Sequence, residues 1–371
     1  MIAQSFVNQP NVYRQKYSIS YDKLMAKRRS SSSRKPTLVD VAKAANVSAI
    51  TVSRTIRSPE LVSPQMRIRV EAAVEKLGYS PDPAASALAS RVTHNIGLLL
   101  PSLTNTVFED VLDGIYEVSE ETRFFIQIGD TRYSALKEEA LIGTFLRQKP
   151  AGLILTGFEQ TEKARKMLSS AHCPIVQIMD YGGTPIDMAV GFDHEAAGYA
   201  AAAHLIECGY RNPGCVGARL DARSRRRLDG FRKACQEANL WDERRMVTTP
   251  QSSSVGLGRH MLEEMLSKDE TVDAIFCNND DIGIGVLVEA QRRLISVPDQ
   301  LGICSFHDME MTKHMHPALT AIATPRYEIG KMAFEMLLAE IDQPQSVKKR
   351  IVNSGFELKK RSSTKNLAGK F

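Results

Sequence analysis

The sequence predicts an α/β protein with a small helical unit at its N-terminus, and three observations lead to this prediction. Helix-capping residues recur between residues 35 and 80. From His94 onward, short apolar runs alternate with amphipathic stretches over about 260 residues, a pattern typical of doubly wound parallel sheets with helices on both faces. Basic charge is confined to one end, because residues 1–91 hold 15 Lys and Arg against 6 Asp and Glu, whereas the remainder holds 33 against 37.

Three helices are predicted near the N-terminus from their caps and turns: Thr37 with Asp40, Asn46, Ser48, Ser63 with Pro64, and Gly78. Ser, Thr and Asp accept bonds from the first free amides of a helix, proline suits its first position, and glycine its end. Asn tolerates the left-handed backbone of a sharp turn. The first helix should run to about Ala45 and the second from Ala49 to about Ile56. The small core is expected to hold Leu38, Val41, Val52 and Ile56.

Two short helices joined by a tight turn predict a helix-turn-helix, whose second helix enters the major groove of DNA. The candidate contacts are Ser48, Ala49, Ile50, Thr51, Ser53 and Arg54. Arg54 can pair with guanine O6 and N7, while Ala49 and Ile50 can meet thymine methyl groups. The hydroxyl side chains can bond phosphates. The pattern alone also allows a three-helix bundle that packs against something other than DNA.

Residues 35–90 resemble the headpiece of the LacI/GalR family of transcription regulators. The shared pattern is AxxAxVSxxTVSRxxR followed by VSPxxRxRVxxAxxxLGYxPxxxAxxL. The resemblance implies a DNA-binding headpiece over residues 35–80 and a hinge over 81–91 that becomes helical on DNA. Leu88 matches the hinge leucine that wedges into the minor groove. Residues 1–34 are polar and basic without periodicity, so we expect a disordered tail there.

The resemblance further implies that residues 92–371 form a two-lobed, periplasmic-binding-protein-like core that binds an effector. Lobe 1 should cover about 94–193 and 326–353, and lobe 2 about 194–322 with the C-terminal stretch. Strands are expected over 95–101, 123–130, 151–157, 174–180, 188–193, 213–218, 272–278, 300–306 and 319–324. Helices are expected near 106–120, 135–147, 160–170, 195–208, 224–238, 256–267, 280–294 and 327–341.

Polar and aromatic side chains at the carboxyl ends of these strands are the candidate ligand contacts, because parallel sheets bind ligands at that edge. They are Asn105, Phe108, Asp180, Tyr181, Arg219, Arg223, Arg227, Gln251, Asn279 and His307. Arginine can clamp a carboxylate, and amide or carboxylate groups suit sugar hydroxyls. A solvated loop or a phosphate-facing patch is the alternative interpretation of the arginine cluster.

By resemblance, six residues match effector-pocket positions of the family: Phe108, Asp180, Tyr181, Asp193, Arg227 and Asn279. The chain departs from the family where Gly-Tyr-Asp or Gly-Phe-Asp is usual, because it has Ser305-Phe306-His307-Asp308. The motifs LLPSLTNxVFxDVLxGI, QIMD, AVGFD, GARLDxR, QSSS, CNNDDIGIG, FHDME and TPRxxIG are similar to the gluconate-utilisation repressors. That similarity implies gluconate or a related sugar acid as effector.

The expected function is therefore a repressor that leaves a palindromic double-stranded operator when a sugar acid binds. A palindrome implies a homodimer, with a dimer favoured over a tetramer. No cofactor, metal site or membrane span is expected, and the HDMEMTKHMH segment, placed in a loop, lacks regular ligand spacing. Six cysteines without paired spacing indicate reduced thiols of a cytoplasmic protein. The alternatives are a regulator responding to another sugar, a purine or a co-regulator, and a sugar-acid enzyme with an accessory DNA-binding domain.

Overall fold

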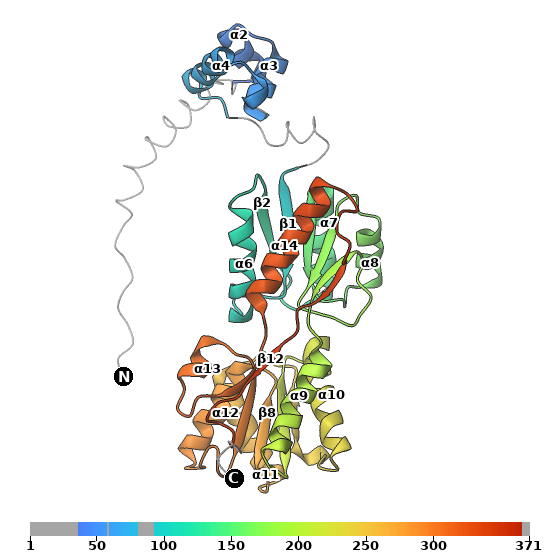
Figure 1. Ribbon diagram of the computed structural model, residues 1–371, viewed down its shortest axis with the longest axis vertical. Coiled ribbons are helices and arrows are strands. Elements are labelled where there is room, and N and C mark those ends of the chain that lie inside the picture. Colours follow the sequence, from blue (N-terminus) through green and yellow to red (C-terminus); the bar gives the residue numbers. More distant parts are fainter. Residues whose placement is uncertain (1–35, 58, 81–92, 366–371) are drawn as a thin grey trace, which may run out of the picture. The chain divides into compact units, whose positions relative to one another are not determined.

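The computed structural model describes residues 36–57, 59–80 and 93–365, and the chain divides into two compact units with the boundary between residues 89 and 90 (Figure 1). The predicted tail over 1–34 and the hinge over 81–91, with Leu88, lie outside the described residues. The described part of the first unit contains helices α2 (Leu38–Ala45), α3 (Ala49–Arg57), η1 (Pro59–Leu61) and α4 (Pro64–Leu77).

The ends of these helices follow from the capping residues. Thr37 and Asp40 form a reciprocal capping box, and Asn46 ends α2 in the left-handed region with a φ of 53°. The Ser48 hydroxyl accepts the amide of Thr51 at 3.1 Å. Gly78 ends α4 with a φ of 60°. Ser63 stands at the N-cap of α4, but its side chain forms no hydrogen bond with the helix. Of the two expected signals, only the proline at the first helical position therefore acts at this helix start.

The core of the first unit is made of small side chains on α2, α3 and α4: Val41, Ala42, Ala45, Val52, Val70 and Ala73. Leu38 is only partly buried against this cluster. The expectation that Ile56 belongs to the core is wrong, because its side chain is 38% exposed. Ile56 lies one turn beyond Val52, where it borders an open groove together with Val70 and Val74.

The second unit contains two six-stranded sheets, which confirms the α/β class. In lobe 1 the strand order is β11-β5-β4-β3-β1-β2, and in lobe 2 it is β12-β10-β9-β8-β6-β7. All pairs are parallel except β10 with β12. The strands of lobe 1 are β1 (Asn95–Leu100), β2 (Phe125–Asp130), β3 (Gly152–Thr156), β4 (Ile175–Ile178), β5 (Met188–Gly191) and β11 (Ile351–Asn353). Those of lobe 2 are β6 (Pro213–Ala218), β7 (Met246–Thr249), β8 (Ala274–Cys277), β9 (Gly302–His307), β10 (Thr320–Ala323) and β12 (Glu357–Lys359).

Helices cover both sheets. Lobe 1 has η2 (Thr106–Phe108), α6 (Glu109–Ser119), α7 (Ala135–Arg147), α8 (Glu162–Ser169) and α14 (Arg326–Asp342). Lobe 2 has α9 (His194–Glu207), α10 (Ala222–Glu237), η3 (Glu243–Arg245), α11 (Val255–Lys268), α12 (Asp280–Arg292) and α13 (Glu310–His314). The HDMEMTKHMH segment was expected to be a loop, but α13 forms within it. Strands β7, β11 and β12 were not predicted.

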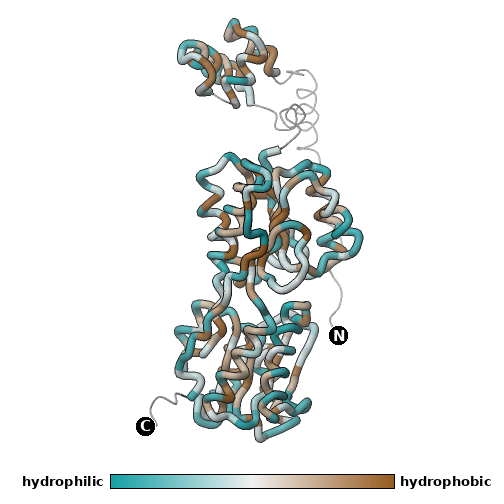
Figure 2. The backbone as a smooth tube through the Cα atoms, turned by 45° about the vertical axis from the view of Figure 1, so that its right-hand side comes forward, coloured by the Kyte–Doolittle hydropathy of each residue, from teal (hydrophilic) through white to brown (hydrophobic). Residues whose placement is uncertain are grey.

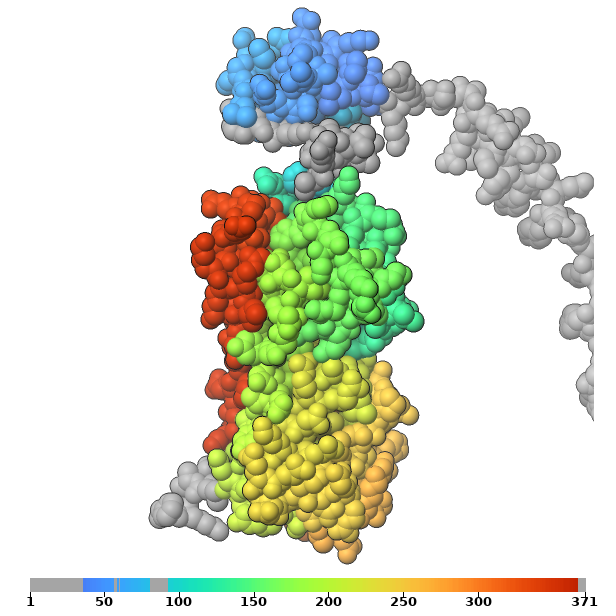
Figure 3. Space-filling view, turned by 90° about the vertical axis from the view of Figure 1, so that its right-hand side faces the viewer, coloured from blue at the N-terminus to red at the C-terminus, as the bar shows by residue number. Residues whose placement is uncertain are grey.

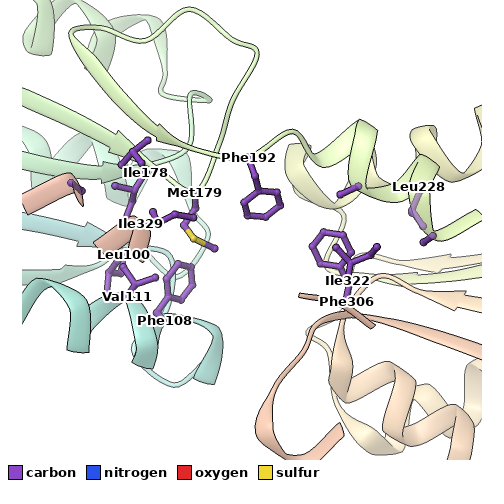
Figure 4. Packing of buried hydrophobic residues seen from close by; sticks show 14 of the residues in the cluster. Leu100, Phe108, Val111, Ile178, Met179, Phe192, Leu228, Phe306, Ile322 and Ile329 are labelled. Atoms are coloured by element: carbon purple, nitrogen blue, oxygen red, sulfur yellow. The ribbon is translucent and has the colours of Figure 1, made fainter. Parts of the chain in front are cut away.

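The chain crosses between the lobes after β5, after β10 and between β11 and β12. The C-terminal segment, red in Figure 3, therefore lies along both lobes. Apolar stretches run through the middle of each lobe in Figure 2. One buried cluster continues from lobe 1 into lobe 2, and Phe192 on the first crossing lies between the two groups of side chains in Figure 4. The two lobes thus share a core beside the cleft.

Candidate functional site

A pocket lies where the carboxyl ends of strands from both lobes face each other, and we call it the cleft pocket. Its lining from lobe 1 is Asn105, Thr106, Val107, Phe108, Tyr133 and Met179. Its lining from lobe 2 is His194, Arg219, Asp221, Arg223, Ser224, Arg227, Ser253, Asn279, Asp280, Asp281, His307 and Met309. Both lobes contribute, so a molecule bound in the pocket would contact both.

The structure brings together most of the candidate ligand contacts in this pocket: Asn105, Phe108, Arg219, Arg223, Arg227, Asn279 and His307. Phe108 and Met179 project from lobe 1 on the side facing Phe306 of lobe 2 (Figure 4). Asn105 has both of its polar atoms engaged, because its amide nitrogen donates to the Tyr133 hydroxyl and its oxygen accepts the amide of Val107. Asn105 therefore holds Tyr133 in place at the edge of the pocket.

Four candidates do not line the pocket: Asp180, Tyr181, Asp193 and Gln251. The buried Asp180 carboxylate binds Arg226 at 2.5 Å, while its other oxygen accepts the Tyr181 amide. Asp193 caps α9 by accepting the amide of Ala196 at 3.0 Å. Gln251 is exposed, and Ser253 from the same loop lines the pocket instead.

Arg227 is fixed in the pocket wall by close helix packing and by hydrogen bonds. A Cβ at Gly198 of α9 would lie 1.9 Å from the backbone oxygen of Arg227, so only glycine lets the two helices approach this closely. The Arg227 side chain donates from Nε to His194 Nδ1 at 3.1 Å and from Nη1 to the Asn278 carbonyl at 2.8 Å. Its guanidinium carbon lies 3.9 Å from the ring centroid of Phe306. Burial lowers the pKa of Arg227 to about 9.

His194 is the partner that Arg227 needs. Burial, reinforced by the charge of Arg227, lowers the pKa of His194 well below its usual value, so the ring is neutral. Nε2 lies 2.9 Å from the Met179 carbonyl, which can only accept, and so carries the proton. Nδ1 is then free to accept from Arg227. His194 also links the two lobes, since Met179 belongs to lobe 1.

The other two pocket arginines have free donors. Arg219 lies over the ring of Tyr133, with 4.0 Å from the guanidinium carbon to the ring centroid, and its buried Nε has no hydrogen-bond partner in the described part of the chain. The Arg223 side chain is 11% exposed, and its nearest carboxylate oxygen is Asp221 Oδ2 at 3.7 Å. These cations can accept an anionic group from a ligand without first losing a hydrogen bond.

The acidic and amide groups of the pocket are bound to nearby donors. Asn279 caps α12 through Oδ1, which leaves its amide nitrogen available. Asp280 accepts the Ser305 hydroxyl at 2.5 Å and the Met309 amide at 2.7 Å, and burial raises its pKa to about 7. Asp221 caps α10 through the amide of Ser224. Helices α9, α10 and α12 all begin at the pocket, so the positive ends of their dipoles favour a bound anion there.

Several residues at the pocket have a left-handed backbone although they are not glycine. They are Tyr133, Met179, Arg219 and His307, with φ angles of 55°, 63°, 53° and 102°. Each follows or ends a strand, and such conformations persist at sites where the surrounding structure holds them. The His307 ring donates to or accepts from the Thr324 hydroxyl at 3.1 Å, and burial together with Arg227 lowers its pKa, so the ring is neutral.

Sequence reasoning missed Tyr133, His194 and Asp221 as parts of the pocket. Asp221 offered a signal, because an aspartate just before a helical stretch at a strand end is a cap. Tyr133 offered none. His194 also offered a signal, because it follows the end of β5.

On α3, the candidate DNA contacts differ in exposure. Ile50 is 71% exposed, and Arg54 is exposed and forms no ion pair or hydrogen bond within the described residues. Ser48 and Thr51 bond each other through their hydroxyls at 2.8 Å. Ala49 packs partly buried against the core of the unit, and Ser53 is half-buried. Ile50 and Arg54 are therefore the side chains most available to a partner.

The remaining site types have little support in the described residues. No group of three or more His, Cys, Asp or Glu there is placed to hold a metal ion. The cysteines are unpaired thiols, and all are buried except Cys173, which is half-buried. Among the helices of the described ranges, none has the length and apolar content to cross a membrane.

Two family models match the chain. A model described as bacterial regulatory proteins, lacI family, matches residues 37–82, which include α2, α3 and α4. A model described as a periplasmic binding protein-like domain matches residues 202–364, which include most of lobe 2 and the crossings back to lobe 1. The two matches fall on the two units of the structure.

Relatives resemble the chain over most of its length. An HTH-type transcriptional regulator, GntR, from Pseudomonas aeruginosa is 41% identical over 89% of this chain and 96% of its own length. The GntR regulator of Escherichia coli K12 is 36% identical over 88% of this chain and 97% of its own. A crystal structure of a LacI family regulator from Silicibacter pomeroyi superimposes with a TM-score of 0.83 at 34% identity, covering 89% of this chain and all of that one. The chain belongs to the LacI family of bacterial regulatory proteins, and it is a DNA-binding transcriptional regulator.

Proposed function

We propose that this protein is a repressor of sugar-acid utilisation genes that leaves its operator when a gluconate-type acid binds in the cleft pocket. The observation that carries the proposal is the set of three arginines, Arg219, Arg223 and Arg227, in one pocket with the free amide of Asn279. Guanidinium groups match a carboxylate, and amides match hydroxyls. A neutral sugar would leave buried arginine charge without a partner, which is costly. The resemblance to GntR regulators supports the same class of effector.

Contacts across the cleft explain how a ligand could act at a distance. Arg226 of lobe 2 binds Asp180 and Glu159 of lobe 1, and Arg219 of lobe 2 stacks on Tyr133 of lobe 1. A ligand that contacts both lobes favours the lobe arrangement to which it binds better. If the operator prefers the other arrangement, ligand and operator weaken each other by the same factor.

The DNA end of the proposal rests on α3. Ile50 and Arg54 are placed to contact base edges, with the hydroxyls of Ser48, Thr51 and Ser53 at phosphates. A palindromic operator requires two copies, so the proposed active form is a homodimer. The wedge role of Leu88 stays a prediction, because this residue lies outside the described part of the chain.

The test combines binding and release. The purified full chain is titrated onto a labelled operator, and fluorescence anisotropy is followed while gluconate, glucose or hypoxanthine is added. Release by gluconate with little effect of the other two supports the proposal. Equal release by glucose, or release by the purine alone, contradicts it. In parallel, the melting temperature should rise with gluconate concentration, because a ligand bound only to the folded state stabilises it.

A further inference from the structure

Helix α10 carries a run of arginines whose side chains leave the helix in different directions, since successive residues are rotated by about 100°. Arg225 is exposed and donates to the Leu220 carbonyl. Arg226 crosses to lobe 1, where it binds Glu159 and Asp180. Arg227 is bound to His194 and to the Asn278 carbonyl. Of the four arginines between residues 223 and 227, these three thus have their guanidinium groups engaged by other groups of this protein.

Arg223 is the exception. Its side chain is 11% exposed, yet its guanidinium forms no hydrogen bond with any described residue. Asp221 is the ion-pair partner within 4.0 Å, with its Oδ2 3.7 Å away, and that side chain already accepts the amide of Ser224. The carboxylates of Asp180, Glu159 and Glu138 act on Arg223 from farther away and form no hydrogen bond with it. A largely buried guanidinium has lost much of its hydration, and an ion pair at this distance replaces few of the five donor bonds that it can form.

Arg223 is also accessible from two sides. It lines the cleft pocket, and it lines a second cavity at the carboxyl edge of the lobe 1 sheet. Tyr133 and Asp221 border both cavities, whereas Arg227 and Arg219 border the cleft pocket only. The donors of Arg223 therefore face the space that a ligand can enter, and they stand where the two cavities meet.

We propose that Arg223 binds the carboxylate of the effector and determines the preference for an acid, whereas Arg227 is a positioning residue that holds His194 and the loop after β8. This assignment rests on the proposed function. The planar fork of Arg223 can donate two parallel bonds to a carboxylate. Such bonds would supply the partners that Arg223 lacks. Arg227 would have to break its bonds to His194 and Asn278 before it could do the same.

The test measures binding of the full chain to two ligands of equal carbon number by calorimetry. The probes are sodium gluconate and D-glucitol, in which a hydroxymethyl group replaces the carboxylate. The wild type should prefer gluconate, and Arg223→Gln should lower gluconate affinity by about 10- to 100-fold while leaving glucitol binding unchanged. Arg223→Lys should recover part of the loss, because it restores the charge without the fork.

Two further variants make the assignment falsifiable. Arg232→Gln is the matched control, because Arg232 lies on the same helix against Trp241 and lines neither cavity, and it should keep the wild-type preference. Arg227→Gln should weaken both ligands alike and lower the melting temperature of the unliganded protein. The melting temperature and operator binding of Arg223→Gln serve as the check that this variant is folded.

The outcomes separate the two proposals. A wild type with no preference for gluconate over glucitol overturns the sugar-acid function and this assignment with it. A wild type that prefers gluconate, with an equal preference in Arg223→Gln, overturns the assignment alone. Loss of the preference in Arg227→Gln, with glucitol binding retained, would assign the carboxylate to Arg227 and likewise contradict the inference.

Discussion

On α3 the side chains offered for recognition stand in solvent, whereas those around the cleft pocket are buried and bonded to one another. Ile50 is 71% exposed and Arg54 has no partner among the described residues, while Arg227 is 6% exposed and bonded on two sides. The difference follows from what each surface meets. A recognition helix enters a wide groove as a convex element, but a small ligand must be enclosed.

The difference also predicts how substitutions act. A change on the exposed face of α3 removes a contact with DNA and leaves the folded unit intact. A change in the pocket also breaks bonds within the protein, so its effects on binding and on stability appear together. Four measurements can test this contrast, and they differ in the size of the effect that each should show.

The largest effect is expected for Arg227→Ala. Removing this guanidinium leaves His194 and the Asn278 carbonyl without their donor and opens a space over Phe306. Each buried acceptor left without its donor typically costs about 1–3 kcal/mol, so the loss of both bonds should cost about 2–6 kcal/mol. Calorimetric unfolding of the full chain should show this loss, and the gluconate-dependent rise in melting temperature should vanish. Arg225→Ala, on the exposed side of α10, is the control and should change the free energy of unfolding by less than about 1 kcal/mol. An equally small cost for Arg227→Ala would contradict the view that the pocket side chains stabilise one another.

The next effect is that of Arg54→Ala on DNA binding. Loss of a bidentate contact with guanine should cost about 1–3 kcal/mol on the cognate operator and relax the preference at one G·C position. The melting temperature should not change, because Arg54 is exposed and forms no hydrogen bond or ion pair with another described residue. Anisotropy with cognate and scrambled duplexes provides the measurement. Equal losses on both would identify Arg54 as a phosphate contact.

A smaller effect concerns pH. Burial raises the pKa of Asp280 to about 7, so its carboxyl gains charge as the pH rises through neutrality. A charged Asp280 repels an acid in the same pocket, whereas the acid itself stays ionised throughout this range. Gluconate should therefore bind more tightly at pH 6 than at pH 8, by up to about tenfold. Titration calorimetry at pH 6 and pH 8 would measure this difference in gluconate affinity, and Asp280→Asn should remove it. Tighter binding of gluconate at pH 8 would exclude repulsion by Asp280.

The smallest effect is expected for Ile50→Ala. Because the side chain is 71% exposed, the free energy of unfolding should change by less than about 0.5 kcal/mol. Specific operator affinity should nevertheless fall by about 1 kcal/mol, through lost apolar contact with a thymine methyl group. Val52→Ala on the same helix is the contrasting variant, since Val52 is buried in the core. A clear destabilisation by Ile50→Ala would mean that this face of α3 is covered.

The helix ends were predictable from the sequence because they depend on neighbours in the chain. Thr37, Asn46, Ser48 and Gly78 act on amides or carbonyls within a few residues, and the structure places each helix end beside them. Buried strands were equally visible as apolar runs. The edge strands β7, β11 and β12 were not visible in the sequence, because they have only three or four residues with mixed exposure. No run of apolar side chains therefore marks them.

The pocket was predictable only in outline. A residue after a strand can be assigned to the correct edge of its sheet, but the sequence does not show which lobe supplies its partner. Asp180 lies at the expected strand end, yet Arg226 from the opposite lobe binds it and keeps it out of the pocket lining. Tyr133 enters the lining through a left-handed turn after β2 that carries no glycine or asparagine to indicate it.

The backbone at His307 limits how the choice of ligand can change in evolution or by design. With a φ of 102°, this position accommodates glycine readily, asparagine and aspartate with some strain, and β-branched side chains hardly at all. Arg219 and Met179 impose a similar restriction on the pocket wall. A library that randomises these positions would therefore lose most of its members to misfolding. Asn279, Ser253 and Phe108 have ordinary backbone angles, so new specificities should arise there first.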